Sequence, residues 1–139
     1  MKTDCTPEQL EFQGLGKKKI LVNNEGEETS TDGGILLLQT AEQYLGIIDK
    51  LAECFTDRRA QWAVIHPLKD LLKQRIFGLA QGYEDLNDHE IWRSDPLLRS
   101  ICGKGENPLA GKSTLNRLEL GMETQDYGDR YTRFLGTIK

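Results

Sequence analysis

Residues 67–81 read PLKDLLKQRIFGLAQ and carry the clearest helical pattern in the chain. Large apolar side chains recur there at intervals of three and four residues: Leu68, Leu72, Ile76 and Leu79. This spacing places them on one face of an α-helix, and the proline at the start of the stretch suits a first helical turn. The sequence therefore predicts a helix over 67–81 whose apolar face is buried.

Shorter helical patterns lie on both sides of this stretch. They cover residues 35–45, 47–55, 86–92, 97–101 and 113–120. Capping residues or glycines bound most of them, as expected at helix ends. Nearer the N-terminus, residues 20–22 have the pattern of a short strand, with a hairpin partner in residues 27–31. The sequence predicts a mainly α fold, in which a short N-terminal β-hairpin precedes a helical bundle.

The length of 139 residues fits a single domain, 1–139. We divide it into an extended or hairpin segment (1–32), a helical core (33–121) and a tail (122–139). The tail carries apolar side chains at loosely helical spacing: Tyr127, Tyr131, Phe134, Leu135 and Ile138. An amphipathic aromatic tail indicates a surface for a partner, or a chain that is cut short.

Composition and charge limit the classes of function. No apolar run approaches the roughly 18–20 residues that span a bilayer, and the first residues lack the apolar stretch of a secretory signal. We therefore expect a cytoplasmic protein with no membrane partner. The net charge is −4, which argues against a basic tail that coats nucleic acid but leaves room for a local basic face.

Metal, nucleotide and acid–base chemistry are disfavoured. The three cysteines and two histidines are too widely spaced for a disulfide scaffold or a zinc ribbon. Residues 111–113 read GKS, like the end of a phosphate-binding P-loop, but the first glycine of that motif falls on Glu106. Asp85, Asp88 and His89 could share a helix face, although acids at a helix start commonly face solvent and favour its dipole. We expect no cofactor and no metal site in this chain.

Residues 110–119 carry the side-chain types that contact DNA. A turn of small residues precedes a helix that Ser113 can cap, and Leu115 and Leu118 would hold this helix to the core. This arrangement resembles the second helix of a helix-turn-helix. The predicted DNA-binding residues are Lys112, Ser113, Thr114, Asn116 and Arg117, with Lys73 adding a phosphate contact from a neighbouring helix. The alternative is that Arg117 pairs with Glu119 or another nearby acid and only stabilises the surface.

Three blocks of the chain together resemble the opening region of bacterial insertion-sequence transposases. They read STDGGILLLQTAEQYLGIIDKLAECFTDRR (30–59), DLLKQRIFGLAQGYEDLNDHEIWRSDPLL (70–98) and LAGKSTLNRLE (109–119). From the first block to the last, this region spans about 90 of the 139 positions, with the order and spacing of the family. Such transposases belong to the DDE class, whose catalytic domain is RNase H-like, and the blocks resemble a branch that transposes by cutting and pasting.

The resemblance implies that this region lies ahead of the catalytic domain and helps to recognise transposon ends or to assemble the synaptic complex. The first catalytic aspartate of the family is then expected beyond Lys139, so no catalytic residue is carried over. We expect no strand cleavage by the chain in isolation, and we expect a divalent metal such as magnesium only in the absent catalytic domain. The expected partners are DNA at the terminal repeats, that catalytic domain and a second copy of the chain.

Two functions therefore compete. The chain is either a DNA-binding domain that recognises transposon ends, or an interaction module that dimerises or docks on the catalytic domain without touching DNA. The aromatic tail favours the second, and binding of DNA with steep salt dependence would separate the two. A self-sufficient metal-dependent nuclease is disfavoured, because the sequence shows no acidic ligands on recognisable strands.

Overall fold

The computed structural model describes residues 10–15, 18–22, 30, 32–123 and 136. Strands β1 (Leu10–Leu15) and β2 (Lys18–Val22) pair antiparallel, with Leu10 opposite Val22. The strand expected at residues 20–22 lies within β2. Its expected partner, residues 27–31, lies outside the described residues apart from Ser30, as does the tail apart from residues 122, 123 and 136.

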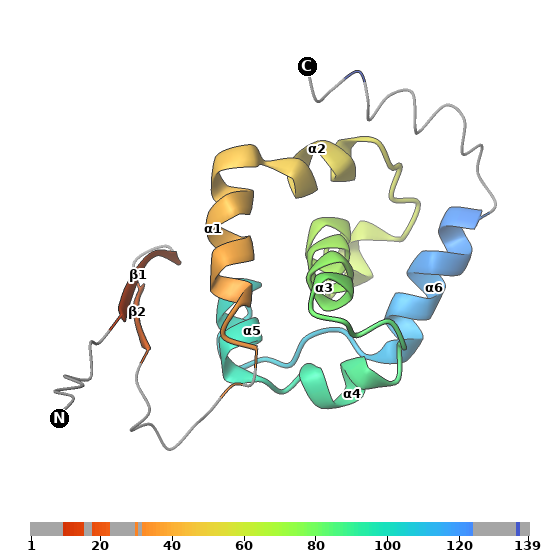
Figure 1. The fold of residues 1–139 in the computed structure, drawn as a ribbon. Coiled ribbons are helices and arrows are strands. Elements are labelled where there is room, and N and C mark those ends of the chain that lie inside the picture. The colour runs from red at the N-terminus through yellow and green to blue at the C-terminus, as the bar shows by residue number, and fades with distance from the viewer. Residues whose placement is uncertain (1–9, 16–17, 23–29, 31, 124–135, 137–139) are drawn as a thin grey trace, which may run out of the picture.

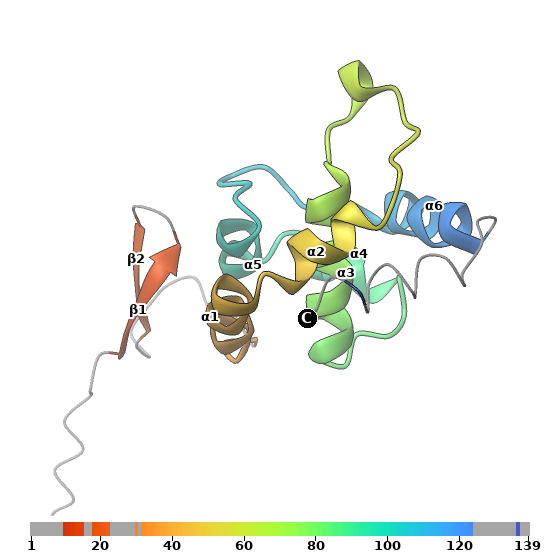
Figure 2. The ribbon, with the colours of Figure 1, turned by 90° about the horizontal axis from the view of Figure 1, so that it is seen from above.

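Six α-helices follow in the described part of the chain. They are α1 (Ile35–Leu45), α2 (Ile47–Glu53), α3 (Leu68–Ala80), α4 (Asp88–Trp92), α5 (Pro96–Ile101) and α6 (Lys112–Glu123). Figure 1 shows α3 at the centre, with the other helices arranged around it. The loop between α2 and α3 carries a 3-10 turn, Gln61–Ala63, and stands out from the body of helices (Figure 2). The expected helical fold is therefore confirmed, and none of the described helices is long and apolar enough to cross a membrane.

Local signals in the sequence fix two of the helix starts. Asp95 accepts a hydrogen bond from the Leu98 N–H (3.0 Å), and a proline follows it in the first turn of α5. At the α1–α2 corner, Gly46 adopts a left-handed φ of 60°, which glycine tolerates without steric cost. The Glu42 carboxylate then accepts hydrogen bonds from two N–H groups of the first turn of α2.

The predicted burial of α3 needs one correction. Leu72 is buried as expected, and Leu68 and Ile76 are half-buried against the core. The prediction for Leu79 is wrong, because 47% of this side chain is exposed. The buried face of α3 is rotated away from Leu79 and includes Gln74 and Gly78. The spacing of large apolar residues alone therefore misplaces the centre of this face.

Gly78 allows α4 to pack closely against α3. A Cβ atom at this position would lie 2.7 Å from His89 Cε1 and 3.2 Å from Trp92 Cζ3. The His89 side chain is fully buried, and its ring meets the Trp92 ring edge-on at 5.4 Å between centroids. Asp32 then ties the start of α1 to α4, because its carboxylate accepts a hydrogen bond from Trp92 Nε1 (2.9 Å).

Candidate nucleic-acid interface

The inward face of α6 is fixed to α3 by packing and polar contacts. Leu115 is fully buried and Leu118 is half-buried, which confirms that these leucines hold the helix to the core. Directly before α6, the buried Gln74 amide donates to the Ala110 carbonyl (2.8 Å) and accepts from the Ala110 N–H (3.0 Å). Further along, Arg75 Nε forms an ion pair with Glu119 Oε1 at 2.5 Å. These contacts set which side of α6 faces solvent.

The outward face of α6 carries four exposed side chains at the spacing of one helix face: Ser113, Asn116, Arg117 and Leu120. Because Glu119 pairs with Arg75, the alternative pairing of Arg117 with Glu119 does not form. Within residues 32–123, the Arg117 guanidinium makes no ion pair at all. The face therefore presents one uncommitted cation beside two neutral hydrogen-bonding side chains.

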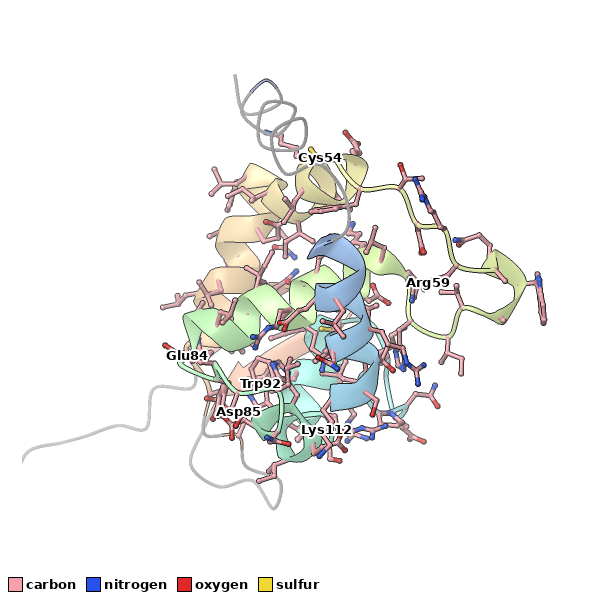
Figure 3. All side chains as sticks on the ribbon, turned by 90° about the vertical axis from the view of Figure 1, so that its right-hand side faces the viewer. Cys54, Arg59, Glu84, Asp85, Trp92 and Lys112 are labelled. Atoms are coloured by element: carbon pink, nitrogen blue, oxygen red, sulfur yellow. The ribbon has the colours of Figure 1, made fainter. Side chains whose placement is uncertain are left out.

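The N-terminal end of α6 has a different character, since the Glu90 carboxylate lies against it and is itself paired with Arg93 (3.3 Å). The Lys112 N–H donates to Glu90 Oε1 (2.7 Å), and the Lys112 ammonium donates to Asn87 Oδ1 (3.1 Å). The hydrogen bond from the Lys112 N–H lowers the pKa of Glu90, so this carboxylate stays charged. In Figure 3, Lys112 lies at the base of α6.

Glu90 thus occupies the place that a phosphate would take at the positive end of α6. The space is also tight, because a Cβ atom at Gly111 would lie 2.9 Å from Glu90 Oε1. The chain's own Glu90–Arg93 pair therefore lies at the start of α6, whereas Asn116 and Arg117, one turn later, are exposed.

Two predicted DNA-binding residues lie away from this outward face. Thr114 is half-buried and lines a groove beside α6. Lys73 is directed to the end of α5, where its ammonium donates to the Ile101 carbonyl (2.8 Å) and lies 5.6 Å from the centroid of the Phe77 ring. Burial lowers the pKa of Lys73. The structure therefore does not bring Lys73 together with the residues of α6.

The groove lies between α6 and the loop that joins α2 to α3, and its volume is about 630 Å³. From α6 it is lined by Thr114, Arg117, Leu118 and Gly121. The loop contributes residues 55–60 and 63–66, and α3 contributes Leu68 and Leu71. Figure 3 shows the loop with Arg59 beside α6. Apolar and cationic side chains thus share one groove.

Only one arginine of the loop has an acidic partner. Arg59 donates two hydrogen bonds to the Asp57 carboxylate (2.8 and 2.7 Å) and a third to the His66 carbonyl (3.0 Å), which closes the loop on itself. The bonds from Arg59 lower the pKa of Asp57 to about 2. Arg58 makes no ion pair within the described part of the chain, so it joins Arg117 as a second uncommitted cation of the groove. Sequence reasoning missed Arg58, and the adjacent basic pair 58–59 was the only signal for it.

The connection before α6 is longer than the turn of a compact helix-turn-helix. α5 ends at Ile101 and α6 begins at Lys112, so ten residues join them where that motif uses about three or four. α3, rather than α5, supplies the contacts to α6 described above. The helix-turn-helix interpretation gains no support from this connection.

The acid–base candidate of the sequence does not assemble. Asp85 Oδ1 accepts hydrogen bonds from Asn87, whereas His89 is a core residue whose ring nitrogens face Gln74 Nε2 and Arg75, each at 3.4 Å. Burial and the nearby guanidinium lower the pKa of His89 and keep its ring neutral. Among the residues that the structure describes, no three His, Cys, Asp or Glu side chains could hold a metal ion.

Comparison with known proteins agrees with the resemblance. The sequence model of the family described as Transposase DDE domain group 1 matches residues 12–135, which includes all of the described helices. Neither curated proteins nor solved structures gave a match. The family match covers most of the chain, and the chain therefore belongs to the DDE transposases of group 1.

Proposed function

We propose that this chain is a DNA-binding domain of its transposase and contacts the transposon ends through the outward face of α6. The observation that carries the proposal is that Arg117 is exposed, while the nearest acidic residue of the same helix, Glu119, is paired with Arg75. Arginine reads guanine and binds phosphate through the same planar set of donors. Asn116 and Ser113 add neutral groups that can bond base edges or phosphates.

The contact between Glu90 and the start of α6 refines this proposal. A recognition helix commonly presents its N-terminal residues to the bases, but here Glu90 lies against that end of α6. We infer that DNA approaches around Asn116 and Arg117. Lys112 then acts as a peripheral phosphate contact after its ammonium leaves Asn87, and Lys73 takes no part.

A titration of the full chain with DNA tests the proposal. A labelled duplex carrying the terminal repeats of the element is compared with a scrambled duplex of the same composition, at several salt concentrations. Tighter binding of the terminal repeats, weakening steeply with salt, is expected, because each neutralised phosphate contributes a slope of roughly −0.9. Equal and weak binding of both duplexes would contradict recognition of transposon ends.

A second candidate function, self-association, rests on a separate observation on α1. This helix and the corner that follows it expose large apolar side chains: Leu37, Tyr44, Leu45 and Ile47. The first three lie at positions i, i+7 and i+8, on one side of the helix. Exposed apolar side chains on one side of a helix are typical of protein–protein contacts, so we propose that a second copy of the chain packs there.

Sedimentation analysis tests this candidate independently of DNA. The variant Tyr44→Lys places a charge in the centre of the patch, where 87% of the tyrosine is exposed, so the fold should persist. A wild-type dimer that becomes a monomer in this variant is the expected result. A wild-type chain that sediments as a monomer at all concentrations would contradict self-association through α1.

A further inference from the structure

The groove beside α6 is positively charged, although the whole chain carries a net charge of −4. Its charged lining consists of three arginines and one aspartate: Arg58, Arg59, Arg117 and Asp57. Arg59 is paired with Asp57. Burial lowers the pKa of His66, which also lines the groove, so its ring is neutral near pH 7. Arg58 and Arg117 are therefore left to bind an anion.

The same groove offers apolar side chains, namely those of Leu68, Leu71 and Leu118. A ligand that suits both kinds of lining combines an anion with a flat apolar group, as a nucleotide combines a phosphate with a base. The volume of about 630 Å³ lies in the range of sites for small molecules. The groove therefore admits a few nucleotides of one strand and excludes a duplex, whose bases are also hidden by stacking.

An exposed tryptophan stands at the rim of this groove. Trp62 lies in sequence between the lining residues Ala60 and Ala63, in the 3-10 turn of the loop that stands out from the helices (Figure 2). Trp62 is 92% exposed, and bases of a single strand stack on aromatic side chains. Arg58 lies four positions before Trp62, so at most about 14 Å separates their backbones, or about four nucleotides at the 3.4 Å spacing of stacked bases.

Hydrogen bonds hold this loop in place before any ligand binds. Arg59 Nη1 donates to the His66 carbonyl (3.0 Å), and Gln61 Nε2 donates to the Arg59 carbonyl (3.1 Å). From outside the loop, Lys104 Nζ donates to the Ile65 carbonyl (3.4 Å). A loop that is fixed in this way loses less conformational freedom when it binds a ligand. The tryptophan of the 3-10 turn is thus presented on a preorganised support.

We propose that the groove and its loop bind an unpaired DNA strand. Arg58 and Arg117 bind phosphates of this strand, the leucines of the lining contact a base, and Trp62 stacks on a base that leaves the groove over the loop. Because Arg117 also lies on the outward face of α6, the strand continues from the duplex that this face recognises. That continuity rests on the proposed function, whereas the binding of a single strand does not.

Tryptophan fluorescence of the full chain tests the contact, because its two tryptophans lie in different surroundings. Trp92 is buried and bonded to Asp32, so a base that stacks on the exposed Trp62 quenches the emission of Trp62 alone. A single-stranded oligothymidylate should quench the wild type and leave the emission of Trp62→Phe unchanged. Equal quenching of both chains, or no quenching of the wild type, would overturn the proposal.

The affinity for the same oligonucleotide gives a second readout. Trp62→Ala should weaken binding roughly 5- to 150-fold, as the loss of one stacked base does. Arg58→Ala should also weaken it, and should make the salt slope shallower by about 0.7 for the lost phosphate contact. The matched control Ile91→Ala removes an exposed apolar side chain from α4 and should bind like the wild type. Wild-type affinity in either loop variant would overturn the proposal.

A protein partner is the alternative occupant of the loop. If the emission of Trp62 moves to shorter wavelengths as the chain is concentrated, and DNA leaves it unchanged, the loop joins two copies and the proposal is overturned. Duplexes of the terminal repeats judge the proposed function separately. Quenching by the single strand without any preference for these duplexes would retain the groove as a DNA site and remove the proposed function. The reverse result would remove the groove alone.

Discussion

Gln74 and Ala110 exchange two hydrogen bonds across 36 positions of sequence, and both residues are buried. The side-chain amide of Gln74 acts there like the backbone of a neighbouring strand, because it satisfies both the N–H and the carbonyl of Ala110. The pairing also fixes the orientation of the amide, so its nitrogen faces His89 Nδ1 at 3.4 Å. One glutamine thereby positions the start of α6 and contacts the buried histidine of α4.

Replacing this glutamine by a side chain of similar size removes both bonds. In Gln74→Met, the N–H and the carbonyl of Ala110 lose their partner in a buried place, and each unsatisfied group costs about 1–3 kcal/mol. We expect the free energy of unfolding in urea to fall by about 2–4 kcal/mol. The control Gln61→Met changes an exposed glutamine and should cost less than about 0.5 kcal/mol; similar losses in both variants would refute the role of Gln74.

Two helical glycines should respond in opposite directions to the same substitution. Alanine favours a helix over glycine by about 1 kcal/mol, and a Cβ atom at Gly121 meets nothing within 4 Å. Gly121→Ala should therefore raise stability slightly. In Gly78→Ala the new methyl group meets His89 and Trp92, and overpacking of about 1–3 kcal/mol outweighs the propensity gain. Thermal unfolding of both variants measures the difference, and a stabilised Gly78→Ala would show that α3 and α4 are less tightly packed than described.

Acidification should weaken the fold before its carboxylates titrate. Burial lowers the pKa of both His89 and His66 in the folded chain. Below the ordinary value of about 6.5, the unfolded chain therefore binds protons that the folded chain does not, and stability falls as pH falls. Each histidine contributes at most about 1.4 kcal/mol per pH unit. Urea unfolding at pH 7.5, 6.5 and 5.5 should show this decline.

The variant His66→Gln separates the two histidines. In this variant, the free energy of unfolding should still fall in part as pH falls, because the fully buried His89 remains. A profile that is flat between pH 7.5 and 5.5 in the wild type would contradict the burial of a neutral His89.

Residue patterns predicted the helices of this fold better than the faces they bury. The signals at Asp95 and Gly46 are local, since a cap or a left-handed turn depends on the few residues around it, and they placed helix ends correctly. The face of α3 depends on distant partners. Gln74 is buried because Ala110 meets it, and Gly78 is buried because His89 fills its missing side chain. Nothing near these two residues in the sequence indicates either contact, so apolar spacing alone selects Leu79 as a core residue.

In the candidate site, too, local patterns could be predicted from the sequence and long-range contacts could not. The side chains that hold α6, Leu115 and Leu118, follow from their spacing, and so does the exposure of Asn116 and Arg117 on the other side. The partners of the charged groups do not follow from the spacing, because Arg75 contacts Glu119 across 44 positions of sequence and Glu90 contacts Lys112 across 22. These long-range pairings decide which cation of α6 is available to an anion.

The proposed contact between α6 and DNA is tested most directly by measuring DNA binding and its salt dependence in one arginine variant and one lysine variant. Fluorescence anisotropy with a terminal-repeat duplex compares the wild type with Arg117→Ala and with Lys69→Ala, an exposed cation paired with Asp49 away from α6. We predict that Arg117→Ala weakens binding by about 1–3 kcal/mol, roughly 5- to 150-fold. It should also reduce the preference over scrambled DNA, whereas Lys69→Ala leaves both unchanged. An Arg117→Ala chain that binds the terminal repeats with wild-type affinity and salt dependence would contradict the account.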